Sequence, residues 1–396
     1  MEIRRDALLK RLMDLRYNGM IKVITGMRRC GKSYLLFRLF SEALKAEGVS
    51  DEHIVMVNLE DRRNKVLRDP DKLLEYIDSR LKDDQMHYVL LDEVQLVSDF
   101  EDVLNSYLQV KNADLYVTGS NARFLSKDIV TGFRGRGFEI KVHPLSFFEI
   151  HNARPDEPVE NLWVEYMTYG GLPQVVTMTS TQEKVVYLKS LFKHTYLKDI
   201  KERYDIKLDG DLEELISTLA STVGGLTNPR KLADTFRTVK KSTISQDTIK
   251  VYIDYLQDAF IIERALRYDI KGRRYIDTPS KFYFEDLGLR NALLNFRQVE
   301  KTHLMENAIY NELRTRGMAV DVGEVIWNTK DEDGKKIRKI LEVDFVCNQG
   351  YKRAYIQSAF SIPDDTKRDQ ELQSLRRIDD SFQKVVIIGD HSPRYQ

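Results

Sequence analysis

The 396-residue sequence has no net charge, only two cysteines and no long apolar run. Lys plus Arg and Asp plus Glu both number 62, so net charge says nothing about a nucleic-acid partner, and any basic surface has to be local. Cys30 and Cys347 lie far apart, which favours reduced thiols in the cytosol over a disulfide. No apolar run of about 18 residues and no signal-peptide pattern occurs, so we expect a cytoplasmic protein without membrane contact.

Low-complexity tracts and internal repeats are also absent from the sequence. What remains is an ordinary globular composition, with 42% hydrophobic and 31% charged residues. A chain of this length is expected to hold two or three domains.

The stretch ITGMRRCGKSYLL, residues 24–36, matches the phosphate-loop pattern G-x-x-x-x-G-K-[ST] at every fixed position. An apolar, β-branched run at 20–25 precedes it, and residues 32–45 repeat apolar side chains at helical spacing, so the flanks predict a strand and a helix. In such a loop the backbone N–H groups and the helix N-terminus face phosphate oxygens. Lys32 would reach the β- and γ-phosphates, and Ser33 would ligate Mg²⁺. The predicted site for ATP and Mg²⁺ comprises Gly26, Met27, Arg28, Arg29, Cys30, Gly31, Lys32, Ser33 and Tyr34.

An acidic pair follows at the distance that a phosphate loop requires. Residues 53–61 and 86–97 both have the pattern of a strand, and the second carries Asp92 and Glu93 near its end. We expect Asp92 to hold Mg²⁺, usually through water, and Glu93 to polarise the attacking water as a general base. An acidic pair alone often only begins a loop, but its place downstream of the phosphate loop favours the catalytic role.

Polar and basic residues beyond the next strand are further candidates. Residues 114–125 run from an apolar strand into Ser120 and Asn121, either of which could contact the γ-phosphate or the water. The same two residues would equally suit a helix N-cap. Arg134 and Arg136 then lie in a glycine-flanked loop before a strand. An arginine there can stabilise transition-state charge, often across a subunit boundary, or can simply be solvated.

The segments VITGMRRCGKS, VLLDEVQ, TGSNARFLS, RGRGFEIKVHPLSFFE and YGGLPQVV together resemble the bacterial and archaeal AAA-type ATPases that carry an uncharacterised C-terminal domain. The resemblance covers nearly the whole chain, including EIRRDALLKRL and TYLKDIKERYDI. It implies ATP hydrolysis, assembly of identical subunits into a ring such as a hexamer, and a finger or sensor role for Arg136. It also implies that Asn58 could link Glu93 to a bound partner, and it implies no particular substrate.

A helix pair and a hairpin follow the predicted ATPase core. Helical periodicity within 224–236 and 242–260, and strand patterns at 261–269 and 280–286, predict a winged helix-turn-helix. Residues 228–250 hold six basic residues against two acidic ones, which favours DNA. The alternative is a winged helix that contacts protein or serves as a lid. The candidate DNA contacts are Lys240, Lys241, Gln246, Thr248, Lys250, Arg273 and Arg274.

The last third has the strand and helix pattern of a small restriction-endonuclease-like domain. Glu306, Glu342 and Asp344 are its candidate carboxylates for Mg²⁺. The position of the acid-x-Lys signature reads Gln-Ser-Ala at 357–359, so a second carboxylate and a lysine are missing. We therefore favour a degenerate domain that binds DNA or a neighbour over an active nuclease.

These features predict an α/β fold: a P-loop AAA+ parallel sheet with helices on both faces, then a winged helix-turn-helix, then a restriction-endonuclease-like domain. The expected parts are an ATPase core at 1–150, a helical linker or lid at 151–210, the winged helix at 211–284 and the endonuclease-like domain at 285–396. The expected function is ATP-driven remodelling of, or translocation on, duplex or branched DNA. The alternatives are a nucleotide-dependent switch that binds protein partners, and an ATP-dependent metal nuclease.

Overall fold

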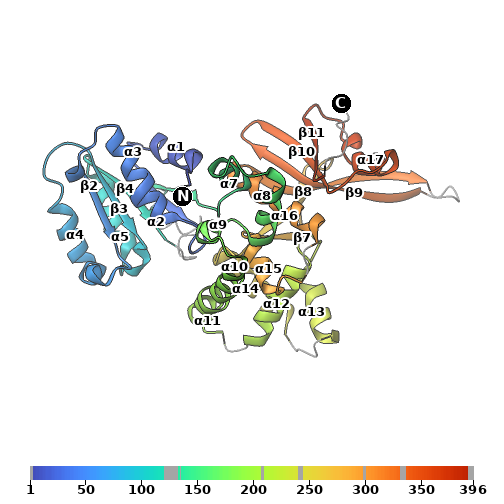
Figure 1. Ribbon diagram of the computed structural model, residues 1–396, viewed down its shortest axis with the longest axis horizontal. Helices are drawn as coiled ribbons and strands as arrows, with labels where there is room; N and C mark the ends of the chain where they lie inside the picture. The colour runs from blue at the N-terminus through green and yellow to red at the C-terminus, as the bar shows by residue number, and fades with distance from the viewer. Residues whose placement is uncertain are drawn as a thin grey trace. The chain divides into compact units, whose positions relative to one another are not determined.

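The computed structural model describes residues 3–119, 133, 135–206, 209–239, 244–297, 300–330 and 336–390. Contacts within it divide the chain into two compact units. Unit 1 comprises residues 1–156 and 172–177, and unit 2 comprises residues 157–171 and 178–396. Figure 1 shows the helices and strands of both. Within the described part of the chain, no helix has both the length and the apolar character needed to cross a membrane.

Unit 1 is built on a five-stranded parallel sheet in the order β2-β3-β4-β1-β5 (Figure 1). The central strands are apolar on both faces, which is why a parallel sheet buries them completely. The α/β class and the parallel sheet expected from the sequence are therefore confirmed. The strands are β1 (Ile21–Thr25), β2 (Ile54–Asn58), β3 (His87–Asp92), β4 (Ala113–Thr118) and β5 (Gly137–Lys141).

Helices cover both faces of this sheet. On one face Phe100, Val103 and Leu104 of α5 join the same apolar core as strand residues such as Val89. On the other face the Phe40 ring lies 4.5 Å from the Tyr116 ring of β4, between ring centroids. The helices are α1 (Asp6–Asp14), α2 (Lys32–Tyr34) continuing through η1 (Leu35–Phe40) into α3 (Ser41–Ala46), α4 (Pro70–Asp78), α5 (Phe100–Ser106), α7 (Phe147–Ala153) and α9 (Pro173–Thr177), with single 3-10 turns at η2 (Asp51–His53), η3 (Arg62–Arg68), η4 (Val94–Leu96) and η5 (Tyr107–Gln109).

Unit 2 combines helices with a mixed six-stranded sheet in the order β11-β10-β9-β8-β6-β7. Neighbouring strands are antiparallel except for the parallel pairs β6–β8 and β10–β11. The strands are β6 (Ile262–Asp269), β7 (Arg274–Phe284), β8 (Ala319–Lys330), β9 (Lys336–Gln349), β10 (Lys352–Ala359) and β11 (Gln383–Ile388). The helices are α8 (Val159–Tyr169), α10 (Thr181–Leu191) continuing through η7 (Phe192–Leu197) into α11 (Lys198–Arg203), α12 (Asp209–Ser221), α13 (Pro229–Val239), α14 (Gln246–Asp258), α15 (Leu287–Leu293), α16 (Lys301–Thr315) and α17 (Asp365–Leu372), followed by η8 (Leu375–Arg377).

Two buried polar residues at the start of α15 bind the helices of unit 2 together. Arg290 donates from Nε to the Ala220 carbonyl at 2.8 Å, and Asn291 donates from Nδ2 to the Met167 carbonyl at 2.8 Å. Asp286, the N-cap of α15, also accepts from the Gly171 N–H at 2.8 Å. These bonds fix the connection between α8, α12 and the sheet.

The predicted hairpin is longer than expected, because β7 begins at Arg274 and not at Ser280. Tyr275 pairs with Tyr268 of β6, so most of the expected loop is strand. Pro279 lies within β7, which is the edge strand of its sheet, where proline is tolerated. Through β6 and β8 the hairpin belongs to the same sheet as the C-terminal strands, so this sheet spans the expected boundary between 284 and 285.

Candidate nucleotide-binding site

Two glycines give the phosphate loop its shape at the carboxyl end of β1. Gly26 has a φ of 139°, and a Cβ on it would lie 2.1 Å from the Val142 carbonyl oxygen, so a side chain does not fit. Gly31 has a φ of 99° and is the N-cap of the helix that starts at Lys32. Both conformations are accessible to glycine and costly for other residues. The loop's backbone can therefore approach a phosphate group closely.

A buried arginine, Arg5, holds the backbone of this loop in place by hydrogen bonds. Arg5, 4% exposed, donates from Nη1 to the Cys30 carbonyl at 3.2 Å and from Nη2 to the His143 carbonyl at 2.9 Å. Its charge is balanced by Glu149 at 2.9 Å, which also forms a capping box with Ser146 at the start of α7. Sequence reasoning missed this role of Arg5. The segment EIRRDALLKRL, which contains Arg5, contributed to the family resemblance, but the sequence assigned no function to any of its residues.

Lys32 lies across the mouth of the loop. Its Nζ donates to the carbonyl oxygens of Gly26, at 2.9 Å, and Met27, at 3.0 Å, and the residue is only 4% exposed. The ammonium group is thus held next to the loop's backbone, where a nucleotide's phosphates would lie. The other side chains of the loop divide between the interior and the surface: Met27 and Cys30 are buried, Arg28 is half-buried, and Arg29, Ser33 and Tyr34 are exposed.

The structure brings Ser33 and Asp92 together, as the sequence predicted. Ser33 donates from Oγ to Asp92 Oδ1 at 3.0 Å, and Thr118 of β4 donates to the same oxygen at 2.5 Å. Burial raises the pKa of the Asp92 carboxyl, although the two hydroxyl hydrogen bonds oppose the shift. This set of closely spaced oxygen donors fits Mg²⁺, which prefers oxygen ligands, and a cation there would offset the cost of burying the carboxylate charge.

Glu93 turns away from the strand that carries Asp92. Its φ of 56° and ψ of 49° are left-handed, which is uncommon for a residue other than glycine. Its N–H donates to Thr118 Oγ1 at 3.0 Å, and its carboxylate accepts a hydrogen bond from Gln95. Thr118 therefore fixes Asp92 and the backbone of Glu93 at once. Thr118 was not among the predicted site residues, although it directly precedes the Gly-Ser-Asn segment that was.

A hollow of about 270 Å³ adjoins the loop at Cys30 and Gly31. Its wall combines apolar side chains from three separate segments with the exposed ring of Tyr34 and the stem of Arg5. The remaining lining residues are Ile3, Leu145, Pro173, Gln174 and Thr177. All of them belong to unit 1.

Arg136 lies at the end of the sheet where the strands begin, whereas the phosphate loop lies at the end where β1 finishes. Its carbonyl accepts from the Ile21 N–H at 2.9 Å, at the beginning of β1, whereas the loop follows the end of β1. At about 3.3 Å per residue the two positions are about 17 Å apart. Several other predicted residues lie outside the described residues, namely Ser120, Asn121, Arg134, Lys240 and Lys241.

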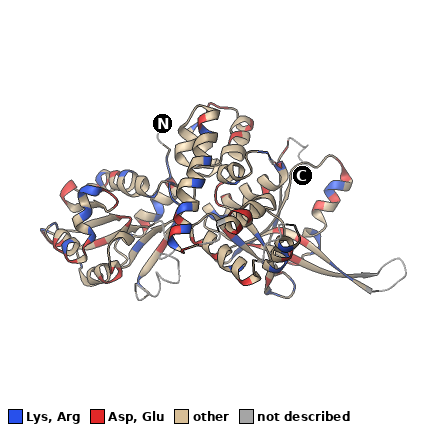
Figure 2. Cartoon of the chain, turned by 90° about the horizontal axis from the view of Figure 1, so that it is seen from below, with Lys and Arg blue, Asp and Glu red and all other residues tan. Residues whose placement is uncertain are grey.

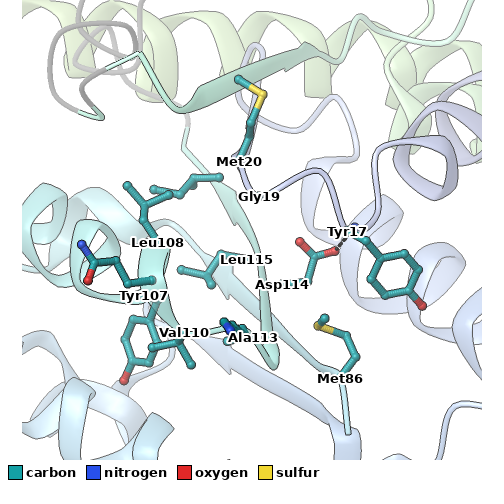
Figure 3. A pocket seen from close by; sticks show the side chains of 13 residues that line it. Tyr17, Gly19, Met20, Met86, Tyr107, Leu108, Val110, Ala113, Asp114 and Leu115 are labelled. Carbon is teal, nitrogen blue, oxygen red and sulfur yellow. Dashed lines mark hydrogen bonds between the residues drawn. The ribbon is translucent and has the colours of Figure 1, made fainter. Parts of the chain in front are cut away.

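A second hollow, of about 340 Å³, also lies at the end of the sheet where the strands begin, among the first residues of β1 and β4 (Figure 3). Apolar side chains such as Met20, Leu108 and Leu115 line it, and the Tyr17 N–H donates to Asp114 at 3.3 Å. Asp114 also forms a buried ion pair with Lys22 of β1. This hollow is too far along the strands to serve the phosphate loop.

In unit 2 the three predicted carboxylates gather around a lysine that sequence reasoning did not select. Lys281 of β7, 3% exposed by side chain, lies 2.9 Å from Glu306 and 2.6 Å from Glu342. Burial lowers the pKa of Lys281, but the three carboxylates outweigh burial and raise it. Burial, followed by the charge of Glu306, raises the pKa of Asp344 to about 7. Alanine thus occupies position 359, where the acid-x-Lys signature has lysine, while Lys281 of β7 supplies a lysine to the same cluster.

The described candidates for DNA contact are accessible. Gln246 and Lys250 are exposed on α14, whose N-cap Ser245 accepts from the Thr248 N–H at 3.0 Å. Thr248 itself is half-buried. Lys250 pairs with Asp247 at 3.2 Å. Figure 2 shows that basic and acidic residues are interspersed along the chain.

Arg273 and Arg274 are exposed at the end of the β6–β7 hairpin. Arg274 lies 3.6 Å from Asp269. The Arg274 side chain is 70% exposed, whereas Asp269 is buried.

Comparison with known proteins places this site in a domain family. A model of the AAA domain matches residues 18–151, and a model of a domain of unknown function, DUF8612, matches residues 160–300. Among solved structures, the Aeropyrum pernix ORC2 protein in ADPNP–ADP complexes shares 13% identity, with 78% of this chain and 93% of that chain covered and a TM-score of 0.42. So distant a likeness assigns no ligand or partner to this chain.

Two full-length relatives are closer in sequence. An uncharacterized protein of Methanocaldococcus jannaschii is 27% identical over 389 residues, covering 93% of this chain and 82% of that protein. An uncharacterized protein of Haemophilus influenzae is 34% identical over 394 residues, covering 98% of this chain and 94% of that protein. The chain therefore belongs to the family of the Haemophilus influenzae protein.

Proposed function

We propose that unit 1 binds ATP with Mg²⁺ and hydrolyses it to ADP and phosphate. The observation that carries this proposal is the meeting of Ser33 and Thr118 on the Asp92 carboxylate, beside Glu93 and at the mouth of a glycine loop. Loop, hydroxyl and acid come from three separate segments of the chain. The fold itself gives no evident reason for these three segments to converge. Burying the Asp92 carboxylate costs free energy, and a bound cation would offset that cost.

Each residue then has a defined task. The loop N–H groups and Lys32 hold the β- and γ-phosphates, while Ser33 and Asp92 hold Mg²⁺, which supplies charge stabilisation at the transferring phosphoryl group. Glu93 accepts a proton from the water that attacks the γ-phosphate. The hollow beside Cys30 and Gly31 is the place for the adenine base, since its apolar wall and the Tyr34 ring suit a flat aromatic ligand.

We further propose that unit 2 contacts DNA and that ATP hydrolysis remodels or moves along it. The order α12, α13, α14, β6, β7 is that of a winged helix-turn-helix, and an antiparallel bridge between Thr227 and Ser280 connects the helices to the hairpin. Lys250, Arg273 and Arg274 offer exposed cations on α14 and at the hairpin end. Cations so placed would hold the phosphate backbone of a duplex.

The place of Arg136, about 17 Å from its own phosphate loop, favours a ring of identical subunits. An exposed arginine at the far edge of the sheet cannot reach the nucleotide of its own chain, but it can complete the site of a neighbour. The proposed assembly is a closed ring such as a hexamer.

The deciding experiment measures the ATPase rate of the full chain with no DNA, and with duplex, single-stranded or branched DNA. We expect hydrolysis in wild-type protein, stimulation by duplex or branched DNA, and loss of both in Glu93→Gln. Hydrolysis without stimulation by any DNA would favour a nucleotide-dependent switch that binds protein partners. Equal rates in wild type and Glu93→Gln would contradict the assignment of the site.

A second candidate function is metal-dependent DNA cleavage in unit 2, and Lys281 is the observation that favours it. A nuclease of this type needs carboxylates for Mg²⁺ and a lysine beside them, and Glu342 and Asp344 lie next to Lys281. Supercoiled plasmid with Mg²⁺ or Mn²⁺ tests the idea. Nicking that disappears in Asp344→Asn would support it, whereas nicking retained in that variant, or absent from wild type, would leave the cluster as a buried ion-pair network.

A further inference from the structure

Two histidines and an aspartate meet where the strands of the unit 1 sheet begin, at the opposite end of these strands from the phosphate loop. His53 and His87 immediately precede the paired residues Ile54 and Tyr88 of the neighbouring strands β2 and β3. The parallel register therefore places the two imidazoles side by side, with ring centroids 4.8 Å apart and ring planes at 72°. Asp83, in the loop between α4 and β3, brings its carboxylate to both rings.

Both rings turn the same nitrogen toward this carboxylate. His53 Nε2 lies 3.0 Å from Asp83, and His87 Nε2 lies 3.9 Å from it. The other nitrogen of each ring is engaged elsewhere, since His87 Nδ1 lies 2.8 Å from the Gln85 carbonyl and His53 Nδ1 lies 2.6 Å from Ser50 Oγ. A carbonyl only accepts, so His87 Nδ1 carries the proton and Nε2 of the neutral ring presents its lone pair.

For His87 this is the arrangement by which proteins prepare a histidine ligand. His53 Nε2 instead donates to the Asp83 carboxylate, and it would release that proton on binding a metal. A metal-binding imidazole donates its second N–H to a carbonyl or another acceptor, which fixes the tautomer and the orientation of the ring. His53 and His87 are 7% and 1% exposed, whereas the Asp83 side chain is 45% exposed. Two buried imidazoles with one carboxylate open to solvent leave a path for an ion and room for a water ligand.

We propose that His53, Asp83 and His87 form a binding site for a divalent transition metal, with Zn²⁺ as the best fit. Two imidazoles and a carboxylate suit Zn²⁺, whereas Mg²⁺ prefers oxygen ligands alone. The three ligand atoms lie within 4.8 Å of one another. Tetrahedral Zn²⁺ needs about 3.3 Å between ligand atoms. The Asp83 carboxylate already lies 3.0 and 3.9 Å from the two Nε2 atoms, so binding mainly requires the two imidazoles to approach each other.

The role of this metal is structural and separate from ATP hydrolysis. His87 begins β3 and Asp92 ends it, so the two sites are about 17 Å apart at about 3.3 Å per residue. A bound Zn²⁺ would tie the loop after α4 to the first residues of β2 and β3. It would thereby stiffen the edge of the sheet opposite the phosphate loop, without touching the nucleotide.

The test titrates Zn²⁺ into the full-length protein after EDTA treatment and dialysis, followed by calorimetry without nucleotide. We expect one Zn²⁺ per chain, a visible absorption band when Co²⁺ replaces it, and a higher melting temperature with Zn²⁺ than with Mg²⁺. Asp83→Asn and His87→Gln should each weaken Zn²⁺ binding at least about tenfold, because each removes a ligand. The half-buried His303 on α16, away from this cluster, supplies the matched control, and His303→Gln should bind as wild type does.

His87 is buried, so His87→Gln could fail to fold, and circular dichroism will reveal this. Asp83→Asn then decides alone, because Asp83 is partly exposed and its loss leaves both rings in place. A wild-type protein that takes up no Zn²⁺ at micromolar concentrations would overturn the proposal. Unchanged affinity in folded Asp83→Asn would overturn it equally.

Discussion

At the scale of single residues, the candidate ATP site contains two backbone conformations that cost energy. Arg29 and Glu93, which flank the expected position of the phosphates, both have positive φ, 62° and 56°. Each such residue costs of the order of 1–3 kcal/mol and persists only where the surroundings impose it. At Glu93 the surroundings include Thr118, whose hydroxyl accepts from the Glu93 N–H. The backbone is thus held in a form that directs the carboxylate away from its own strand.

Changing Glu93 to Gln should separate ATP binding from hydrolysis. The amide keeps the shape of the side chain and can still contact Gln95, but it cannot accept a proton from water. We expect nucleotide affinity near that of wild type and hydrolysis at least about tenfold slower. Fluorescent-nucleotide binding and phosphate release measure the two quantities, with the exposed Glu60→Gln as the control. Wild-type turnover in Glu93→Gln would show that another group is the base.

Changing Lys32 to Ala should abolish tight ATP binding. The ammonium group donates to the loop carbonyls of Gly26 and Met27, and it lies where the β- and γ-phosphates are expected. A hydrogen bond to a charged group contributes about 1.5–3 kcal/mol, so affinity should fall at least about tenfold. Isothermal titration with ATP measures the loss, and Lys65→Ala on the surface serves as control.

Asp344 gives unit 2 a pH dependence with a definite sign. Its pKa in the folded chain is about 7, above the ordinary value, chiefly because burial disfavours the charge. Between about pH 4 and pH 7 the folded state therefore binds more protons here than the unfolded state, and this residue's contribution to stability falls as pH rises. We expect Asp344→Asn to stabilise the chain more at pH 8 than at pH 5, relative to wild type.

Urea denaturation at the two pH values measures that difference, followed by a signal from unit 2. The exposed Asp365→Asn is the control, because its removal should shift both midpoints alike. An Asp344→Asn variant that is equally stabilised, or equally destabilised, at both pH values would show that Asp344 stays ionised in the folded chain.

At the scale of elements, the register of β1 against β5 decides how Arg136 can act. Because the strands are parallel and Ile21 pairs with Gly137, Arg136 stands at the end of the sheet where β1 begins. The phosphate loop stands at the other end. An arginine finger at Arg136 therefore has to serve a neighbouring subunit.

Mixing Arg136→Ala protein with Lys32→Ala protein should restore part of the lost ATPase activity. A mixed interface can join an intact phosphate loop from one chain with an intact Arg136 from the other. Activity should pass through a maximum as the mixing ratio varies, and light scattering confirms that the variants assemble. Mixtures of Lys32→Ala with Arg62→Ala, at an unrelated exposed arginine, control for the effect of assembly itself. Absence of recovery at every ratio in assembled protein would exclude action in trans.

Elements differed in how far the sequence alone could predict them. The five strands of unit 1 are short apolar runs, and all five were expected. The predicted ranges ran up to seven residues past the ends of the strands, and the fifth strand was expected without a range. The extension of β7 escaped prediction because Pro279 hides an edge strand, and only the sheet reveals that β7 lies at the edge. Arg5 and Lys281 escaped because their roles depend on contacts with residues more than 20 positions away, for which a single sequence carries no signal.

At the scale of the whole molecule, a balanced net charge requires that any DNA contact be local. The described candidates are few: Gln246, Thr248 and Lys250 on α14, and Arg273 and Arg274 at the hairpin. Lys250 and Arg274 also have acidic neighbours. A surface of this kind would bind DNA through a small number of phosphate contacts. It would do so with moderate affinity and no inherent sequence preference.

The salt dependence of DNA binding tests this surface. Each phosphate neutralised contributes about −0.9 to the slope of log K against log salt, so replacing Arg273 and Arg274 together with Ala should flatten the slope by about 2. All duplex sequences should weaken similarly, because backbone contacts do not read bases. The DNA-free ATPase rate should stay at the wild-type value, since both residues belong to unit 2 and the phosphate loop to unit 1.

The matched control replaces Lys189 and Lys193, two exposed lysines elsewhere in unit 2, and should leave the slope unchanged. If the arginine pair leaves the slope unchanged as well, while DNA still binds, the DNA lies on another surface. The α12–β7 module would then be a protein-contact element, and ATP binding would act as a switch between partners. A flattened slope with loss of DNA-stimulated hydrolysis, by contrast, would connect the hairpin of unit 2 to turnover in unit 1, which is the coupling that a DNA-remodelling ATPase requires.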